Sequence, residues 1–456
     1  MRLPLWLALA LLSRSGSGMR THPLIRGSIF ASFLLLAACG GSARLPVSAG
    51  TGPNPQIPEP RTSLIPTVNV VTAKGWTAEE MPTPASGLHV TAFARGLSHP
   101  RWLYVLPNGD VLVAETNAPK RPDDNKGLKG WFFKKFQAKA GGGVPSANRI
   151  TLLRDGDGDG VAETRYALLT GLSSPFGMAL VGNTLYVANA DALLAFPYTS
   201  GTTHITALPT LVTALPGGPI NHHWTKNVIA SPDGRRLYVS VGSNSNVGEN
   251  GIDKEAERAA VWEVDPATGR HRVFASGLRN PVGMAWMPDT RVLWVSVNER
   301  DELGSDLVPD YMTGLRDGAF YGWPWMYYGT HIDTRPKRRN YDSVAVTTPD
   351  YALGPHTASL GLAWSPENAA SLPQALRHGM FVGQHGSWNR KPRSGYKVIF
   401  VPFEGGLPSG PPVDVLSGFV RDNGDAMGRP VGVAIDGKGA LLVADDVGNA
   451  VWRVGQ

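Results

Sequence analysis

The sequence predicts an all-β protein in which short antiparallel strands repeat around a closed ring. A Gly-rich loop that leads into a short apolar strand recurs in altered form, as at Gly277–Trp286 and Gly428–Ile435. Each such strand is followed by a tight turn and a second apolar strand, as at Pro232–Ser240, which is the pattern of a β-hairpin. Such units recur roughly every 50 to 80 residues, as in propeller blades that carry insertions. We count six units, so the predicted fold is a six-bladed β-propeller with inserted loops.

The composition agrees with this fold class and excludes several functions. Gly 54 and Pro 37 are high and charged residues are only 18% of the 456 residues, which indicates many turns and short strands rather than long charged helices. The formal net charge is +6, but no ordered Lys/Arg array alternates with aromatic residues, so we expect no nucleic-acid partner. The single cysteine forms no disulfide within the chain and no haem attachment motif, so electrons would have to pass to an external acceptor.

Residues 1–38 are predicted to be a lipoprotein-type signal peptide. Arg20 and Arg26 precede an apolar run that is too short to span a membrane, and small residues then lead to Cys39. We expect Cys39 to be lipidated, which would hold the protein to a membrane on the periplasmic side of a bacterial cell envelope. The alternative is an ordinary secretory signal that is cleaved nearby. Met19 begins a self-sufficient signal, so the true start could lie there.

The remaining chain divides into a linker and one domain. Residues 39–85 are rich in Gly, Ser, Thr and Pro and lack periodicity, which predicts a flexible tether. Residues 86–456 would form the propeller. Its last strand, near Ala450–Val454, could share a sheet with a strand near Val90 and so close the ring.

Three segments stand out as insertions or turns. Residues 120–148 contain Lys-rich sequence around Trp131, and they predict either a solvated helix or a basic patch for a membrane surface or redox partner. Residues 302–345 are expected to form a binding loop on a rigid scaffold. Asp155–Gly160 resembles a calcium loop, but Tyr166 stands where such a loop needs Glu. We therefore expect a hairpin turn there, with incidental cation binding.

Polar residues with catalytic chemistry lie in the loops before and after the inner strands. His223 follows His222 just before one such strand, and a histidine at the axial funnel could act as a general base. The alternative for His223 is a buried, hydrogen-bonded side chain. The loop 298–306 is dense in oxygen donors, which suits a hard cation such as Ca²⁺; the alternative is a solvated acidic loop.

Several cations also fall on these loops. Arg279, Arg390 and Arg429 lie in or beside them, and Lys397 follows closely. Converging cations need an anionic partner, and a ligand with several carboxylates would supply it. For each cation alone, a surface ion pair is the alternative.

Together these residues resemble a known family, the soluble sugar dehydrogenases that depend on pyrroloquinoline quinone (PQQ). The similarity is to the glucose and aldose-sugar type, and most closely to the L-sorbosone dehydrogenase branch. It covers about residues 85–456 and rests on three motifs: Gly277–Pro281, the 298–306 loop followed by Tyr321–Pro324, and His385–Arg390.

The resemblance implies PQQ and Ca²⁺ at the axial funnel. It implies that His223 is the catalytic base, that Arg279 and Asn280 contact the quinone, and that Arg279 also stabilises the oxyanion that develops there. The loop with Asp301 and Glu302 would hold Ca²⁺ through backbone carbonyls.

The remaining cations would pair with the carboxylates of PQQ. The resemblance gives this role to Arg429 and to Lys397 or Arg390.

The function that the resemblance implies is oxidation of a sugar or sugar-derived aldehyde, at C1 of an aldose or in an L-sorbosone-like substrate, by hydride transfer to the quinone. The electrons would pass to an external quinone or cytochrome. The alternatives are a calcium-dependent propeller lactonase, which would not need the ring of cations, and a propeller that only binds.

Overall fold

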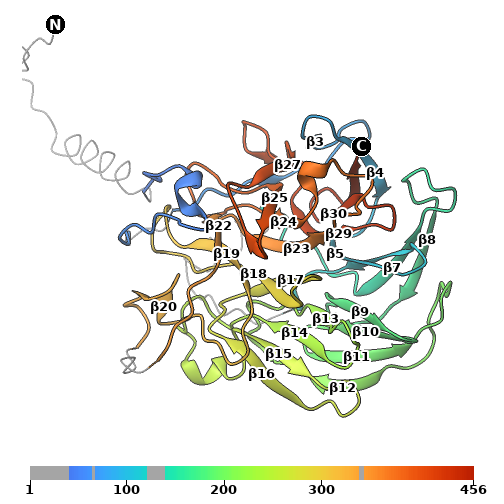
Figure 1. The fold of residues 1–456 in the computed structure, drawn as a ribbon, viewed down its shortest axis with the longest axis horizontal. Coiled ribbons are helices and arrows are strands. Elements are labelled where there is room, and N and C mark those ends of the chain that lie inside the picture. Colours follow the sequence, from blue (N-terminus) through green and yellow to red (C-terminus); the bar gives the residue numbers. More distant parts are fainter. Residues whose placement is uncertain (1–40, 64–66, 121–138, 338–343) are drawn as a thin grey trace, which may run out of the picture. The chain divides into compact units, whose positions relative to one another are not determined.

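The computed structural model describes residues 41–63, 67–120, 139–337 and 344–456, and these form an almost entirely β structure. Six antiparallel sheets of four or more strands succeed one another around a common axis (Figure 1), which confirms the predicted six-bladed propeller. The predicted signal peptide, Cys39 and most of the Lys-rich insertion lie outside the described residues. Within the described ranges, no helix has the length and apolar character needed to cross a membrane.

The first three blades follow one another without interruption along the chain. Blade one contains β5 (Pro100–Val105), β6 (Val111–Glu115), β7 (Arg149–Arg154) and β8 (Thr164–Leu169). Blade two contains β9 (Met178–Val181), β10 (Thr184–Ala188), β11 (Ala192–Pro197) and β12 (Thr210–Ala214). Blade three contains β13 (Val228–Ala230), β14 (Leu237–Val241), β15 (Ala260–Val264) and β16 (His271–Ser276).

The last three blades include strands from distant parts of the chain. Blade four contains β17 (Pro281–Met287), β18 (Val292–Val297), β19 (Pro309–Gly314) and β22 (Tyr351–Pro355). Blade five contains β23 (Ser359–Ser365), β24 (Gly379–Gln384), β25 (Lys397–Glu404) and β27 (Val413–Ser417). Blade six contains β29 (Pro430–Ile435), β30 (Leu441–Asp445), β31 (Ala450–Gly455) and β4 (His89–Arg95), so strands from both ends of the chain share one sheet and close the ring.

The short elements lie in loops or at sheet edges. The two-residue strands are β1 (Thr51–Gly52), β2 (Thr72–Ala73), β3 (Thr83–Pro84), β20 (Met326–Tyr327), β21 (His331–Ile332), β26 (Leu407–Pro408) and β28 (Asp425–Ala426). The described 3₁₀ helices are η1 (Val47–Gly50), η2 (Ile252–Glu255) and η3 (Gln374–Leu376).

An apolar cluster fills the axis of the ring. Each blade contributes to it at or next to its inner strand, in order Trp102, Phe176, Trp224, Val282, Leu360 and Val431. The Phe176 ring lies between two indoles, with centroids 4.7 Å from Trp102 and 6.0 Å from Trp224. The axis is therefore packed with side chains, and a ligand would have to bind above this cluster.

The recurring glycine of the sequence units lies where two inner strands approach each other. A Cβ atom on Gly361 would lie 2.2 Å from the Val431 carbonyl oxygen, and one on Gly283 would lie 2.5 Å from the Leu360 carbonyl oxygen. Gly177 and Gly432 meet the backbone of the next blade in the same way. These glycines are required because the backbones leave no room for a side chain.

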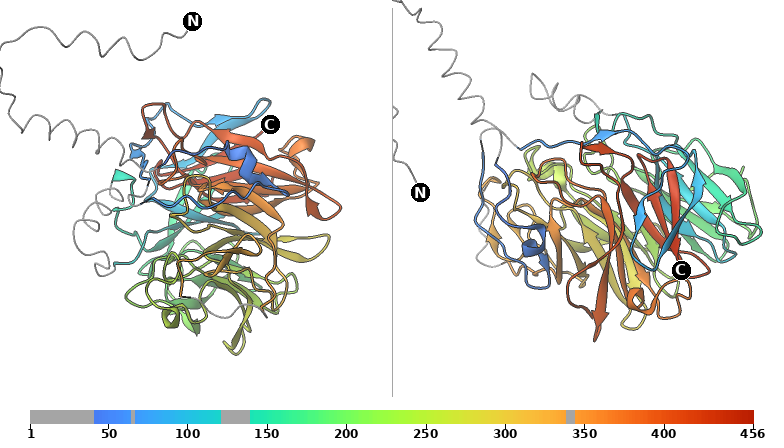
Figure 2. Two further views of the ribbon diagram at one scale, coloured as in Figure 1. Left: turned by 90° about the vertical axis from the view of Figure 1, so that its left-hand side faces the viewer. Right: turned by 90° about the horizontal axis from the view of Figure 1, so that it is seen from above.

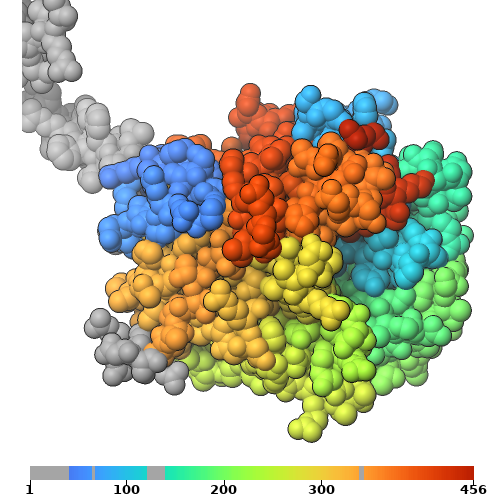
Figure 3. Space-filling model, in the orientation of Figure 1, coloured from blue at the N-terminus to red at the C-terminus, as the bar shows by residue number. Residues whose placement is uncertain are grey.

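The segment before the propeller differs from the predicted tether. Its short strands pair with the propeller: β1 with β22, β2 with β28 and β3 with β27. The Arg61 N–H donates to the Leu303 carbonyl and the Asn69 N–H to the Trp388 carbonyl. Gly- and Pro-rich chain makes few internal hydrogen bonds, so its backbone groups take partners from the loops of blades four to six. The segment (blue) lies against the orange and red parts in Figures 2 and 3.

We expect Gly361→Val to destabilise the fold by about 1–3 kcal/mol or more, because the added side chain must push two inner strands apart. Urea unfolding would measure this. Gly437→Ala is the matched control, because a Cβ there meets no atom within 4 Å, and it should stay within about 0.5 kcal/mol of the wild type. Equal stability of both variants would contradict the role given to the close strand contact.

Candidate functional site

The polar loops of all six blades meet at one end of the ring. The inner strand and the second strand of each blade are antiparallel. The residues that precede the inner strand and those that follow the second strand therefore lie at the same end of the blade. His223 and Arg279 precede inner strands, while Asp301, His385 and Asp446 follow second strands. The fold thus brings side chains from distant parts of the sequence to one rim above the apolar cluster.

His223 is held in a single tautomer. Its Nδ1 lies 2.9 Å from both the carbonyl oxygen and the Oγ of Ser243. The Ser243 hydroxyl donates its hydrogen to the Ser245 carbonyl, so the imidazole must supply the hydrogen in its contact with Ser243. Nδ1 is therefore protonated, and Nε2, which has no hydrogen-bond partner among the described residues, carries the lone pair.

The surroundings of His223 keep it neutral. Burial lowers the pKa of His223 well below its usual value, and the charges of Arg279, His222 and Lys226 lower it further. The Ser243 carbonyl opposes this shift but does not reverse it. His223 is therefore an unprotonated base at neutral pH and stays so well into the acid range.

Lys226 lies directly beneath the His223 loop and was not predicted from the sequence. Its Nζ, on a fully buried side chain, donates to the carbonyls of His223 and Trp224 at 3.3 Å each and to Asn221 Oδ1 at 3.5 Å. Three acceptors match the three N–H groups of an ammonium. Burial, with the nearby charge of Arg258, lowers the pKa of Lys226 well below its usual value, so holding this charge is costly.

A second buried cation shares the same amide. Arg258 donates to Asn221 Oδ1 at 3.1 Å and to the carbonyls of Gly242, Pro216 and Gly217. Neither Lys226 nor Arg258 forms an ion pair with a carboxylate within 4.0 Å in the described part of the chain. Two buried positive charges therefore lie behind His223 without a direct counter-charge.

Arg279, which the resemblance assigned to the quinone, is fully engaged with protein oxygens. Its guanidinium donates to the Glu299 carbonyl at 2.7 Å, to Asn246 Oδ1 at 2.9 Å and to Asp301 Oδ2 at 3.4 Å. The Asn246 and Asn298 carbonyls accept its remaining N–H groups. This arrangement leaves Arg279 no N–H for a ligand, so here it acts through its charge and by holding loops together.

Asn280, in contrast, retains free hydrogen-bonding capacity. Its Oδ1 is buried without a partner, and its side-chain amide nitrogen makes no hydrogen bond with any described residue. Gly242 packs against it and His223: a Cβ there would lie 2.5 Å from Asn280 Oδ1 and 2.4 Å from His223 Cβ. The predicted base and the predicted amide therefore lie next to the same glycine.

Asp301 is a hub of hydrogen bonds, and this conflicts with its predicted role toward Ca²⁺. Its Oδ1 accepts from Asn389 at 2.7 Å and lies 3.4 Å from His356 Nδ1, and its carbonyl accepts from Arg335 at 2.7 Å. Every oxygen of Asp301 thus has a partner, and a Ca²⁺ ion at its carbonyl would have to displace a guanidinium. The residues as arranged do not fit Ca²⁺ at Asp301. Glu302, which is exposed, makes no side-chain hydrogen bond with a described residue.

The ion pair between Asp301 and His356 is set by burial and mutual charge. Burial alone would raise the pKa of Asp301, but the hydrogen bond from His356 and the charge of Arg279 lower it overall. Burial lowers the pKa of His356, but Asp301 reverses this and raises it overall. The attraction between Asp301 and His356 therefore helps to hold the loop that carries Asp301 in place.

A second polar cluster gathers on the opposite arc of the rim around Asp446. Arg101 donates to Asp446 Oδ2 at 2.6 Å, and His385 Nε2 lies 2.9 Å from the same atom. Burial, then the charge of Arg429, lowers the pKa of His385 to about 3. Burial would raise the pKa of Asp446, but His385, His99 and Arg101 hold it well below its usual value. Asp446 was missed, although it follows a second strand as Asp301 does.

The three remaining predicted cations have different surroundings. Arg429 donates to the carbonyls of His385 and Gly386 and keeps one terminal nitrogen without a hydrogen bond to any described residue. Arg390 is buried and donates to the carbonyls of Ser305, Pro392 and Leu45, so it anchors the N-terminal segment. Lys397 pairs with Asp414 of β27 at 2.6 Å, away from the funnel. Of these three described side chains, Arg429 is therefore the one that has an N–H group available to an anionic ligand.

Unpartnered polar atoms at the rim indicate what the site could hold. Within the described ranges, buried side-chain atoms without a hydrogen-bond partner include Arg101 Nε, Thr116 Oγ1, Asn189 Oδ1, Asn244 Oδ1, Asn280 Oδ1 and Asn389 Oδ1. All six belong to residues in or next to the loops of the rim. Buried polar groups normally have partners, so this set fits a polar ligand. The buried cations Lys226 and Arg258 fit a ligand that is an anion.

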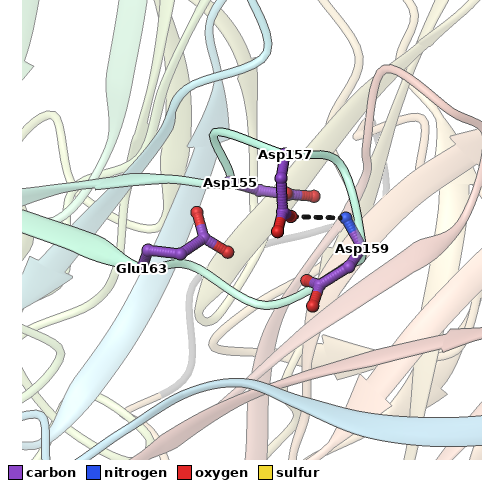
Figure 4. Close-up of side chains that lie close together, drawn as sticks. All are labelled: Asp155, Asp157, Asp159 and Glu163. Atoms are coloured by element: carbon purple, nitrogen blue, oxygen red, sulfur yellow. Dashed lines mark hydrogen bonds between the residues drawn. The ribbon is translucent and has the colours of Figure 1, made fainter.

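The acidic loop between β7 and β8 lies at the opposite end of the blade from this rim. β7 and β8 form an antiparallel pair, which confirms the predicted hairpin. The carboxylate oxygens of Asp155, Asp157, Asp159 and Glu163 lie within 4.8 Å of one another (Figure 4). Several of them accept backbone N–H groups of the same turn, so turn formation accounts for the acidic residues.

A family model described as TrAA12-like matches residues 146–310 and 328–456. A PQQ-dependent pyranose dehydrogenase of Coprinopsis cinerea is 24% identical over 362 residues, which are 70% of this chain but 44% of that protein. The chain thus spans less than half the length of this curated relative. An uncharacterised protein of Borreliella burgdorferi is 25% identical over 305 residues, 63% of this chain and 77% of that protein.

Solved structures share the fold. The holo PQQ domain of the C. cinerea pyranose dehydrogenase superposes with a TM-score of 0.65 at 20% identity, over 85% of this chain and all of that domain. A calcium structure of the Trichoderma reesei family AA12 enzyme gives a TM-score of 0.66 at 17% identity, over 84% of this chain and 100% of that chain. A PQQ-bound aldose sugar dehydrogenase of Streptomyces coelicolor gives a TM-score of 0.51 at 18% identity, over 82% of this chain and 99% of that chain.

We expect Asp446→Asn to lower the free energy of unfolding by about 3–5 kcal/mol, because it leaves the buried Arg101 guanidinium without a counter-charge. The pKa of Asp446 lies below its unfolded value, so this stabilisation is present above about pH 4 and is lost only as the pH falls through the folded pKa. Urea unfolding at neutral and acid pH would measure both. Asp253→Asn, at a carboxylate that is 75% exposed, is the control. If Asp446→Asn lowered the stability as little as Asp253→Asn, the role of Asp446 as counter-charge to Arg101 would be refuted.

Proposed function

The chain belongs to the TrAA12-like family, and on this premise we propose that it is a PQQ-dependent oxidoreductase that oxidises a sugar or a sugar-derived aldehyde. The observation that carries the proposal is the state of His223: a neutral imidazole in one tautomer, with its Nε2 lone pair free. The names of similar proteins support the cofactor and the substrate class, since they include PQQ-dependent pyranose and aldose sugar dehydrogenases. Aldose C1 and an L-sorbosone-like aldehyde are the positions that we propose for oxidation.

The rim offers groups that suit PQQ, which is an acidic quinone. Asn280 would bind it through its unpartnered amide, and Arg101 and Arg429 through N–H groups that have no protein acceptor. Lys226 and Arg258, which form no ion pair with a carboxylate within 4.0 Å in the described part of the chain, would act on it through their charge. When bound, PQQ supplies the quinone that accepts the hydride.

The protein's own contribution to the reaction is proton transfer and orientation. A substrate hydroxyl would give its proton to His223 Nε2, and the Ser243 carbonyl, which accepts the Nδ1 hydrogen, would stabilise the imidazolium that results. Lys226 fixes the loop backbone through the His223 and Trp224 carbonyls. We assign no step to Ca²⁺, because each oxygen of Asp301 has a protein partner.

We expect His223→Ala to retain PQQ binding but to lose about 10²–10⁴-fold in kcat, the range that a general base contributes. Dye reduction with an aldose panel would measure turnover, and the absorption spectrum of PQQ on mixing would measure binding. His89→Ala, at an exposed residue of β4, is the control and should keep the wild-type rate. Near wild-type turnover in His223→Ala would remove His223 from the mechanism.

We also propose that the mature protein is anchored through a lipid on Cys39 at the periplasmic side of the envelope and passes its electrons to an external quinone or cytochrome. The chain has a single cysteine, so one substitution tests the anchor. Radiolabelled palmitate should label the wild type expressed in bacteria and leave Cys39→Ser unlabelled. Equal labelling of the two would place the lipid elsewhere, and no labelling of either would reject the anchor.

A further inference from the structure

The N-terminal segment and the loop after β18 border a partly open cavity of about 950 Å³ beside the rim. The wall from the segment is firmly attached. The N–H groups of Arg44 and Leu45 donate to the Asp306 carboxylate, and the Ser305 hydroxyl donates to the Gly41 carbonyl. The Arg61 N–H donates to the Leu303 carbonyl. Both walls are therefore fixed by direct hydrogen bonds, and the space between them is a built feature of the fold.

The lining of this cavity combines charged side chains with a larger apolar surface, and it carries no net charge among its Arg, Lys, Asp and Glu residues. Its charged side chains are Arg44, Arg61, Arg335, Glu59, Glu302 and Asp306, three of each sign. Serine and threonine residues, Asn389 and Trp388 also line it, together with the apolar residues Leu45, Pro58, Leu303 and Leu307. The polar part of this surface offers both hydrogen-bond donors and acceptors, and its balanced charge gives no preference for an anion or a cation.

The cavity therefore differs from the funnel in the ligand that it suits. The funnel carries the buried cations Lys226 and Arg258, which have no carboxylate within 4.0 Å among the described residues, and this suits an acidic group. The cavity matches a neutral ligand that is dense in hydroxyl groups, because each hydroxyl both donates and accepts. An indole supplies an apolar face beside polar groups, which suits the face of a sugar ring.

The cavity borders the candidate site through Asp301. Asn389, which lines the cavity, donates to Asp301 Oδ1, and Arg335 donates to the Asp301 carbonyl. Asp301 in turn contacts Arg279, whose charge acts on His223. A ligand that fills the cavity would thus lie against the outer side of the loops that form the rim.

We propose that this cavity is a binding site for neutral sugar units, so that the enzyme acts on the end of an oligosaccharide whose further units lie between the N-terminal segment and the 302–307 loop. The cavity is at the upper end of the size range of sites for small molecules, which leaves room for more than one sugar ring. The part of the inference that concerns oxidation rests on the proposed function; the binding site itself does not.

The test is direct binding, measured by calorimetry on the full-length protein without quinone or dye. The probes are three neutral trisaccharides of different linkage, cellotriose, maltotriose and laminaritriose, with glucose for comparison. At least one trisaccharide should bind at least about tenfold more tightly than glucose, which corresponds to about 1.4 kcal/mol.

Two variants test the place of binding. Glu59→Ala with Arg61→Ala removes two exposed lining side chains that make no side-chain hydrogen bond to a described residue, so the fold should persist. This double variant should weaken trisaccharide binding about fivefold or more and leave glucose oxidation unchanged, and Trp388→Ala should weaken it further. Arg235→Ala, 83% exposed in the turn between β13 and β14 at the opposite end of the blades, is the matched control.

The results separate this inference from the proposed function. The inference is overturned if no trisaccharide binds more tightly than glucose, or if the double variant binds as the Arg235→Ala control does. Trisaccharide binding without PQQ-dependent dye reduction would reject the proposed function and keep the binding site. Dye reduction with simple aldoses, without tighter binding of any trisaccharide than of glucose, would keep the proposed function and reject the binding site.

Discussion

The close approach of the inner strands around the axis is the constraint on which the rest of the structure depends. Gly177, Gly283, Gly361 and Gly432 each place their backbone where a side chain would collide with the next blade. Between blades three and four the contact is polar instead: the Asn227 amide donates to the Val282 carbonyl at 2.9 Å. Because the strands are this close, an apolar cluster can fill the axis, and the loops above it are forced into a narrow rim.

The narrow rim explains the electrostatics of the site. Side chains that are far apart in sequence come together with little water between them, so charges act on one another strongly. Burial, with the positive charges nearby, keeps His223 neutral, whereas the neighbours His385, His99 and Arg101 keep Asp446 ionised against the effect of burial. Lys226 and Arg258 have no carboxylate within 4.0 Å in the described part of the chain, and neutral oxygens accept their hydrogen bonds. Asp191 and Glu255 act on them from farther away, and a bound anion would stabilise the two cations further.

The sequence predicted the ring and the place of the His223 loop because both follow from the repeat. A loop that precedes an inner strand must lie at the rim, and this holds for the loops of His223 and Asn280; the role of His223 as a base stays a prediction. The direction of a side chain does not follow from the repeat: Lys397 turns outward to Asp414, and Arg279 turns into a set of carbonyls. Lys226 could have been found, since a lysine three residues after His223 and two residues before an inner strand lies where the chain enters the ring.

The N-terminal segment shows why composition alone does not define a tether. Gly and Pro deprive a chain of internal hydrogen bonds, but a neighbouring surface with open carbonyls and carboxylates can supply them, as Asp306 and Leu303 do here. Once fixed, the segment closes one side of a cavity that the propeller would otherwise leave open. The same loops that anchor it also carry Asp301 and Asn389. A change in the segment would therefore alter the space beside the rim while leaving the inner strands, and the His223 side chain that they position, untouched.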